Sequence, residues 1–313
     1  MTFLPELYEP MTVGSMNVKN RLMMAGMSAG AVADKNGEVA PEMIAYYLER
    51  ARGEPGMMAI GATTVVPPVP GQPNILSFHN DNVIPSMTKL VDAVHEYDTK
   101  FGVQLWNGGG TEMGRHQLIS PSGLSSNVRN ARSDDGKGRK TGQPNRALGL
   151  DEIPEIIQYF AEGALRVAEC GFDFVEIHGG HGYLISNFMT PLFNRRTDKY
   201  GGSFENRTRF ILEIVAAVKA AVGDRIGVGL KFNGDDFLGS DGWTLEESCR
   251  LAPLAEAVGA DYITVTAGLV GSPKLTIPPM YEPQGCYTFL AEAVKPTVSI
   301  PVGTIGRIKD PVM

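Results

Sequence analysis

The sequence contains few cysteines and no long hydrophobic run. Its three cysteines, Cys170, Cys249 and Cys286, lie far apart and include no CxxC pair. They therefore form no iron–sulfur or zinc-thiolate motif, and an odd number argues against a disulfide framework. No apolar run of roughly 18 residues, the length that spans a bilayer, is present. The N-terminal segment lacks the basic start and apolar stretch of a signal peptide, so we expect a cytoplasmic protein without a membrane partner.

An excess of basic residues is also missing. The formal net charge is −7, which disfavours binding to nucleic acid or to an anionic membrane surface. Apolar residues make up 43% and charged residues 20% of the 313 positions, values that are ordinary for a globular enzyme. The expected partner is a small-molecule substrate, and we leave homo-oligomerisation open.

Short apolar runs alternate with amphipathic helical segments along the chain. Asp151 is expected to cap a helix over 151–170, and Gly223 to end one over 204–222 that carries an ion pair between Glu205 and Arg209. Such repeated units predict a parallel sheet covered by helices, and the absence of GxGxxG after the first run disfavours a Rossmann fold. The expected strands are 21–27, 57–63, 101–106, 172–177, 226–232, 262–267 and 301–305.

We predict a single α/β domain over residues 1–313, a (β/α)8 TIM barrel that begins with a β-hairpin. The hairpin is expected in the alternating segment 7–22, with its turn near Gly14. Seven strands precede Met313, so the eighth strand of a complete barrel is expected beyond that residue. The long polar segment 107–150 follows the third strand, and in such a barrel it lies on the active-site face.

Three proton-active side chains, His178, His181 and Tyr183, lie within six residues at the end of the fourth expected strand. Barrel enzymes carry their active sites at the carboxyl ends of strands, so this group indicates a catalytic site. Two imidazoles can stabilise a substrate oxygen while a phenol donates a proton. Histidines three residues apart also suit a metal, and a metal-dependent barrel hydrolase that uses His178 and His181 is an alternative.

The stretch from His178 to Phe210, HGGHGYLISNFMTPLFNRRTDKYGGSFENRTRF, closely resembles the signature of the old yellow enzyme family, the FMN-dependent ene-reductases. The resemblance implies that NADH or NADPH reduces FMN, which then delivers hydride to the C=C bond of an α,β-unsaturated carbonyl compound. It also implies that His178 and His181 bind the carbonyl and that Tyr183 supplies the proton. An amine dehydrogenase on the same scaffold is a second alternative, and a non-catalytic fragment too incomplete to bind FMN tightly is a third.

The family pattern also implies a set of flavin-binding residues: Gly26, Met27, Ser28, Ala62, Gln104, Lys231, Gly306 and Arg307. In this pattern the amide of Gln104 binds the pyrimidine edge of the flavin, for which it offers both a donor and an acceptor. The backbone of Gly306 and the guanidinium of Arg307 hold the phosphate. No protein metal ligands are implied. The charged residues of 194–207, with Arg196 and Arg207 among them, are expected to pin the loop that frames the site.

Four positions depart from the family pattern: Gly26, Asn107, Gly110 and Lys231 stand where proline, histidine, arginine and arginine are usual. Lys231 keeps a positive charge but loses the bidentate fork of an arginine. The segment 278–285, PPMYEPQG, is similar to the longer 2-enoate and 2,4-dienoyl-CoA reductase group. That similarity implies a 4Fe-4S cluster and FAD in a part beyond residue 313.

Overall fold

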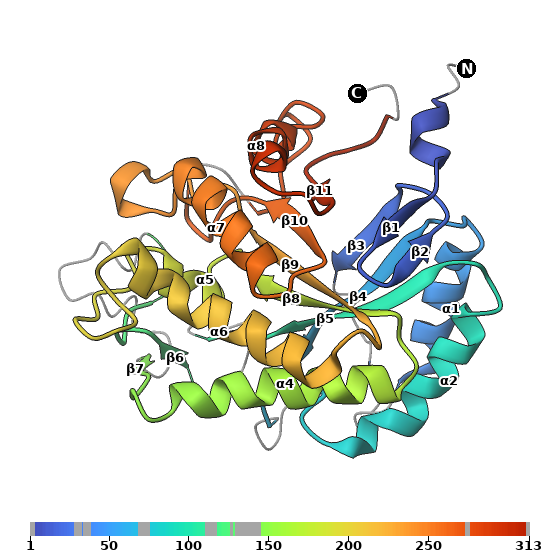
Figure 1. Cartoon of the computed structure of the whole chain (residues 1–313), viewed down its shortest axis with the longest axis horizontal. Coiled ribbons are helices and arrows are strands. Elements are labelled where there is room, and N and C mark those ends of the chain that lie inside the picture. The colour runs from blue at the N-terminus through green and yellow to red at the C-terminus, as the bar shows by residue number, and fades with distance from the viewer. Residues whose placement is uncertain are drawn as a thin grey trace.

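The computed structural model describes residues 4–27, 33, 39–67, 76–109, 118–125, 128, 145–272 and 276–310. Its centre is a curved sheet of seven parallel strands that forms an open barrel (Figure 1). Each strand lies beside the next one along the chain, and β3 and β11 form the two edges. The strands are β3 (Met23–Met27), β4 (Met57–Thr64), β5 (Lys100–Trp106), β8 (Phe174–Gly179), β9 (Gly227–Asn233), β10 (Tyr262–Thr266) and β11 (Val302–Thr304).

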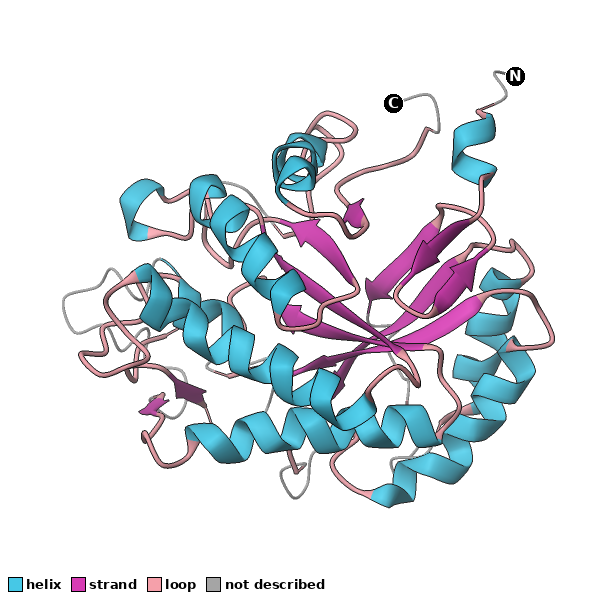
Figure 2. Ribbon diagram, in the orientation of Figure 1, coloured by secondary structure: helices cyan, strands magenta, loops and turns pink. Residues whose placement is uncertain are grey.

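Helices cover the outside of the strands, as Figure 2 shows. They are α1 (Pro41–Ala51), α2 (Ile84–Val94), α4 (Ile153–Glu169), α5 (Leu184–Met189), α6 (Phe204–Val222), α7 (Leu245–Ala257) and α8 (Thr288–Val294). Short 3-10 helices lie at η1 (Pro5–Tyr8), η2 (Asp81–Val83), η4 (Gly239–Asp241) and η5 (Lys295–Thr297). Side chains alternate along a strand, so one set packs on the helices and the other points into the barrel. The outward set, with Val103 and Val228, joins the helix residues Phe160 and Ile211 in the main core.

The N-terminal hairpin closes the amino-terminal end of the barrel. Its strands β1 (Met11–Val13) and β2 (Met16–Val18) are antiparallel, and Gly14 supplies the left-handed turn residue with φ of +56°. Val13 and Met16 pack against Phe174 and Tyr262 in a cluster separate from the main core. The hairpin therefore acts as an apolar plug opposite the carboxyl ends of the strands, where the active site of such a barrel lies.

The structure confirms the seven expected strands and the helix over 204–222, and it corrects two local expectations. Glu152, not Asp151, occupies the cap position of α4, and its carboxylate accepts a hydrogen bond from the Gly149 amide at 2.7 Å. The ion pair between Glu205 and Arg209 does not form. Glu205 instead lies 3.2 Å from Arg250 of α7, and Arg209 donates to the carbonyl of Lys199. An exposed i,i+4 pair contributes only about 0.2–0.5 kcal/mol, so such tertiary partners readily replace it.

The long polar segment after β5 is described only in part, and it includes the parallel strands β6 (Ile119–Ser120) and β7 (Arg146–Ala147). Among the helices that the structure describes, none combines the length and apolar character needed to cross a membrane.

Candidate active site

Polar side chains form a layer inside the barrel near the carboxyl ends of the strands. Phe174, Glu176 and His178 alternate inward along β8, and only Phe174 belongs to the apolar plug. The Glu176 carboxylate is buried and accepts two hydrogen bonds, one from the Gln104 amide at 2.6 Å and one from the Thr264 hydroxyl at 2.7 Å. These contacts turn the Gln104 Nε2 toward Glu176 and leave its Oε1 and its second N–H for a ligand.

The three side chains expected to be catalytic lie together above this layer. The ring centroids of His178 and His181 are 5.0 Å apart, as are those of His178 and Tyr183, and His181 lies 6.4 Å from Tyr183. His178 is the penultimate residue of β8, and Tyr183 is the residue that precedes α5. A short Gly-rich loop between strand and helix thus presents all three groups to one space.

This loop takes a conformation that needs close contacts with β9 and β10. His181 has φ of +62°, the left-handed region, and its backbone N–H donates to Asn233 Oδ1 at 3.0 Å. Its ring Nε2 lies 2.7 Å from the hydroxyl of Thr266. A Cβ atom on Gly180 would lie 2.8 Å from Asn233 Oδ1 and 3.0 Å from Thr266 Cγ2. Glycine is therefore required at 180 for the loop to sit this close to its neighbours.

Burial decides the protonation states at the site. Burial lowers the pKa of His178 well below its usual value, with smaller contributions from His181 and Lys231. Burial and the positive charge of Lys231 lower the pKa of His181 to about 3. Burial raises the pKa of Tyr183. At neutral pH the site therefore presents two neutral imidazoles, each with one N–H, and a protonated phenol.

The expected flavin residues on the first three strands are neighbours. A Cβ atom on Gly26 would lie 3.2 Å from the Gln104 amide, and one on Gly61 would lie 2.7 Å from the Gly26 backbone. Ala62 is half-buried, and Met27 is 51% exposed at the end of β3. Backbone of small residues beside a side-chain amide, here partly exposed at Gly26 and Ala62, can receive a flat ring with polar edges. Ser28 lies outside the described residues.

The cationic residues that were expected to bind the flavin lie on the other half of the sheet. Lys231 pairs with His178 in the β8–β9 register, and burial lowers the pKa of its ammonium while Glu176 opposes that shift. Among the described residues, none accepts a hydrogen bond from Lys231 Nζ. Gly306 and Arg307 follow β11, and Arg307 Nη1 donates to the backbone carbonyls of Met280 and Glu282.

These donors and acceptors fit FMN. The ring system of FMN needs an amide for its pyrimidine edge and a cation beside the carbonyl that becomes anionic on reduction, and Gln104 and Lys231 supply these chemical types. Nε and Nη2 of Arg307 make no hydrogen bond within the described part of the chain and are available to a phosphate. The sequence-based set is thus chemically suited to FMN.

Two buried donors lie at the end of β5, where Asn107 departs from the family pattern. Trp106 Nε1 and Asn107 Nδ2 have no partner among the described residues. The Trp106 ring lies 4.7 Å from that of Tyr183, and Asn107 Oδ1 accepts from the Gly109 amide at 2.9 Å. Polar groups left unpaired in a buried position often contact a ligand. Gly110 lies outside the described residues.

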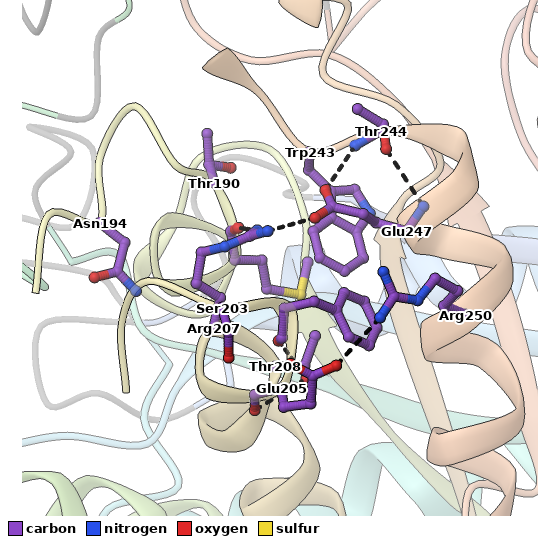
Figure 3. A network of polar contacts seen from close by, with 12 residues as sticks. Thr190, Asn194, Ser203, Glu205, Arg207, Thr208, Trp243, Thr244, Glu247 and Arg250 are labelled. Carbon is purple, nitrogen blue, oxygen red and sulfur yellow. Dashed lines mark hydrogen bonds and ion pairs between the residues drawn. The ribbon is translucent and has the colours of Figure 1, made fainter. Parts of the chain in front are cut away.

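Ion pairs hold the loop that follows α5, as expected from the sequence. Arg207 donates to the Met189 carbonyl and forms a buried ion pair with Glu247 of α7, which also caps that helix through Thr244 (Figure 3). Arg196 and Asp198 form a second pair at 2.6 Å within the loop. The loop and α7 are therefore fixed relative to α5, which carries Tyr183 at its start.

Several residues that shape the site were not predicted from the sequence. The buried Asp236 carboxylate accepts from Thr190 and Asn233 at 2.7 Å each, and Asn233 in turn holds His181. Glu176 and Thr266 also shape the site and were not predicted. Their sequence signal was a polar residue at an inward position of an otherwise apolar strand, two residues from His178 in the case of Glu176.

The part of the chain that the structure describes contains no group of three His, Cys, Asp or Glu side chains arranged to hold a metal ion. His178 Nδ1 accepts from the Gly180 amide at 3.2 Å, and His181 Nε2 contacts Thr266, so each ring already uses one nitrogen within the protein. A zinc site built on this pair would need a third ligand, and the described residues do not provide one.

Known proteins are similar to this chain over nearly its whole length. The NADH oxidase of Thermoanaerobacter brockii is 37% identical over 99% of this chain and 46% of its own length. The cinnamate reductase of Clostridium sporogenes is 31% identical over 97% of this chain and 48% of its own length. A structure of 2-naphthoyl-CoA reductase superimposes with a TM-score of 0.86 at 26% identity, covering 98% of this chain and 47% of that one.

The chain thus spans about half the length of these relatives. The profile of the NADH:flavin oxidoreductase / NADH oxidase family matches residues 6–313. The chain therefore belongs to this family of flavin-dependent NAD(P)H oxidoreductases, the old yellow enzymes.

Proposed function

We propose that residues 1–313 form the FMN-binding barrel of an ene-reductase that uses NADH or NADPH to reduce the activated C=C bond of an α,β-unsaturated carbonyl compound. The observation that carries the proposal is the grouping of two neutral imidazoles and a protonated phenol at one strand end. Cinnamate reductase and 2-naphthoyl-CoA reductase, as relatives, support an enoate or an enoyl thioester as the substrate class.

The roles of the side chains follow from the charge that develops during such a reduction. Bound FMN would supply hydride to the β-carbon of the alkene. Negative charge then grows on the carbonyl oxygen, where the N–H groups of His178 and His181 stabilise it. Tyr183 donates its proton to the α-carbon, because its raised pKa keeps the phenol protonated until then.

The flavin-binding roles extend over the strand ends of the barrel. Gln104 would bind the pyrimidine edge, Lys231 would stabilise negative charge beside it, and Gly306 and Arg307 would hold the phosphate. Gly26, Met27, Ser28 and Ala62 would form the backbone floor. Cys170, Cys249 and Cys286 lie far apart in the sequence and include no CxxC pair, so a 4Fe-4S cluster like that of the longer group would need ligands from outside these residues.

Binding of a phenol tests the proposed function most directly. The protein is reconstituted with FMN and titrated with 4-hydroxybenzaldehyde, whose phenolate oxygen imitates the developing enolate. His178→Ala should weaken this binding by about 10- to 100-fold, the scale of a hydrogen bond to a charged group. His95→Ala is the matched control, because His95 pairs with Asp173 at the other end of the barrel. Equal affinity in both variants, or FMN reduction by amines but not by NAD(P)H, would contradict the proposal.

The pH dependence of alkene reduction gives a second test. Both imidazoles have a lowered pKa, so they remain neutral from mildly acidic to alkaline pH, and Tyr183 keeps its proton beyond its usual range. Reoxidation of the reduced flavin by an enone should therefore show no inflection near pH ~6.5, where a free imidazole titrates. Stopped-flow traces from about pH 6 to about pH 9 measure this. An inflection in that range that disappears in His178→Ala would contradict neutral donors.

A further inference from the structure

We propose that Thr266 is a positioning residue that fixes the tautomer of His181, so that the ring carries its proton on Nδ1 and presents it to the substrate oxygen. The inference rests on the proposed function for its consequence in catalysis. The tautomer itself is inferred only from hydrogen bonds within the protein, independently of the proposed function.

The backbone of His181 is fixed first. Asn233 Nδ2 donates to Asp236 Oδ1 at 2.7 Å and to the Gly268 carbonyl at 3.1 Å. Both of these partners are acceptors, so the amide orientation of Asn233 is determined, and its Oδ1 must face the N–H of His181. A left-handed conformation is unfavourable for a residue other than glycine, so the hydrogen bond from the His181 N–H to Asn233 is needed to stabilise it.

The ring is fixed next, by a single hydroxyl. Thr266 Oγ1 lies 2.7 Å from His181 Nε2, and Thr266 is fully buried. Among the described residues, this nitrogen is the only acceptor within reach of the Thr266 hydroxyl proton. If Nε2 carried the imidazole proton, the hydroxyl proton would be buried without an acceptor. The favoured arrangement is therefore a hydroxyl that donates to Nε2, with the imidazole proton on Nδ1.

The neighbouring histidine has the opposite arrangement. His178 Nδ1 accepts from the Gly180 amide at 3.2 Å, so its proton lies on Nε2. Each ring is thus bound through one nitrogen by the protein and keeps the other N–H for a ligand. A carbonyl oxygen between the two rings would receive one hydrogen bond from His178 Nε2 and one from His181 Nδ1.

The hydroxyl can be removed with little change of shape. Thr266→Val deletes it, Thr266→Ser restores it without the methyl group, and Thr208→Val is the matched control, because Thr208 is equally buried and donates to the Phe204 carbonyl within α6. In ¹⁵N-histidine spectra of the FMN-reconstituted protein, assigned through His181→Gln, we expect His181 to carry its proton on Nδ1. This pattern should persist in Thr266→Ser and Thr208→Val and should change to Nε2 in Thr266→Val.

Binding provides the second readout. Thr266→Val should weaken 4-hydroxybenzaldehyde binding by about tenfold, the scale of one neutral hydrogen bond, and Thr266→Ser should recover it. A wild-type His181 protonated on Nε2, or a tautomer unchanged in Thr266→Val, would overturn the inference. The expected tautomers in a protein that does not reduce enones would instead count against the proposed function alone, because the spectra need no substrate.

Discussion

Tyr183→Phe should slow the reoxidation of reduced flavin by an enone by about 10²- to 10⁴-fold, the usual contribution of a positioned general acid. The variant keeps the ring, which packs against Trp106 and His178 with ring centroids 4.7 and 5.0 Å away. The pocket should therefore retain its shape. Reduction of the flavin by NAD(P)H does not use the phenol and should persist. The loss is thus confined to the step in which the α-carbon gains a proton.

Single-turnover measurements separate the two half-reactions. Tyr159→Phe serves as the matched control, because it removes a tyrosine hydroxyl that donates to Glu155 on the outer face of α4. This control should leave both half-reactions unchanged. Equal slowing of flavin reduction and flavin reoxidation in Tyr183→Phe would show that the phenol shapes the pocket and is not the proton donor.

The sequence predicted the strands well because a parallel sheet covered by helices requires continuous apolar runs. The run 226–232 corresponds to β9 at Gly227–Asn233, and 262–267 to β10 at Tyr262–Thr266. The same logic fails for exposed ion pairs, where long side chains have several partners of similar energy. Glu205 pairs with Arg250, which is 45 positions away, and no local pattern indicates that choice.

The residue pattern alone indicated the site only where its residues are neighbours in sequence, and the expected flavin-binding residues on other strands rested on the family resemblance. His178, His181 and Tyr183 share one loop, and their grouping is visible in the sequence. The residues that orient them come from other strands: Asn233 and Thr266 lie 52 and 85 positions from His181. Which polar side chain meets which ring depends on strand register and on the left-handed conformation of His181, and neither is encoded by a local residue preference.

The sequence did not predict that Glu247 is the ion-pair partner of Arg207. Only the role of Arg207 in holding the loop was expected. Arg207 donates to the carbonyls of Met189 and Gly202, and its side chain is only 8% exposed. The carboxylate of Glu247 in α7 neutralises the positive charge of Arg207 (Figure 3). The pair connects the first turn of α6 to α7, and its two residues are 40 positions apart in the sequence. Its loss should therefore affect both the stability of the fold and the frame of the site.

Glu247→Ala should lower the free energy of unfolding by about 3–5 kcal/mol, because it leaves the guanidinium of Arg207 buried without a counter-charge. Glu247→Gln should lower it less, since an amide can still accept the capping bond from the Thr244 amide. The control is Glu205→Ala, which removes the exposed partner of Arg250 and should change stability little. Urea unfolding followed by tryptophan fluorescence measures all three. A loss for Glu247→Ala no larger than that for Glu205→Ala would show that the pair does not hold the loop.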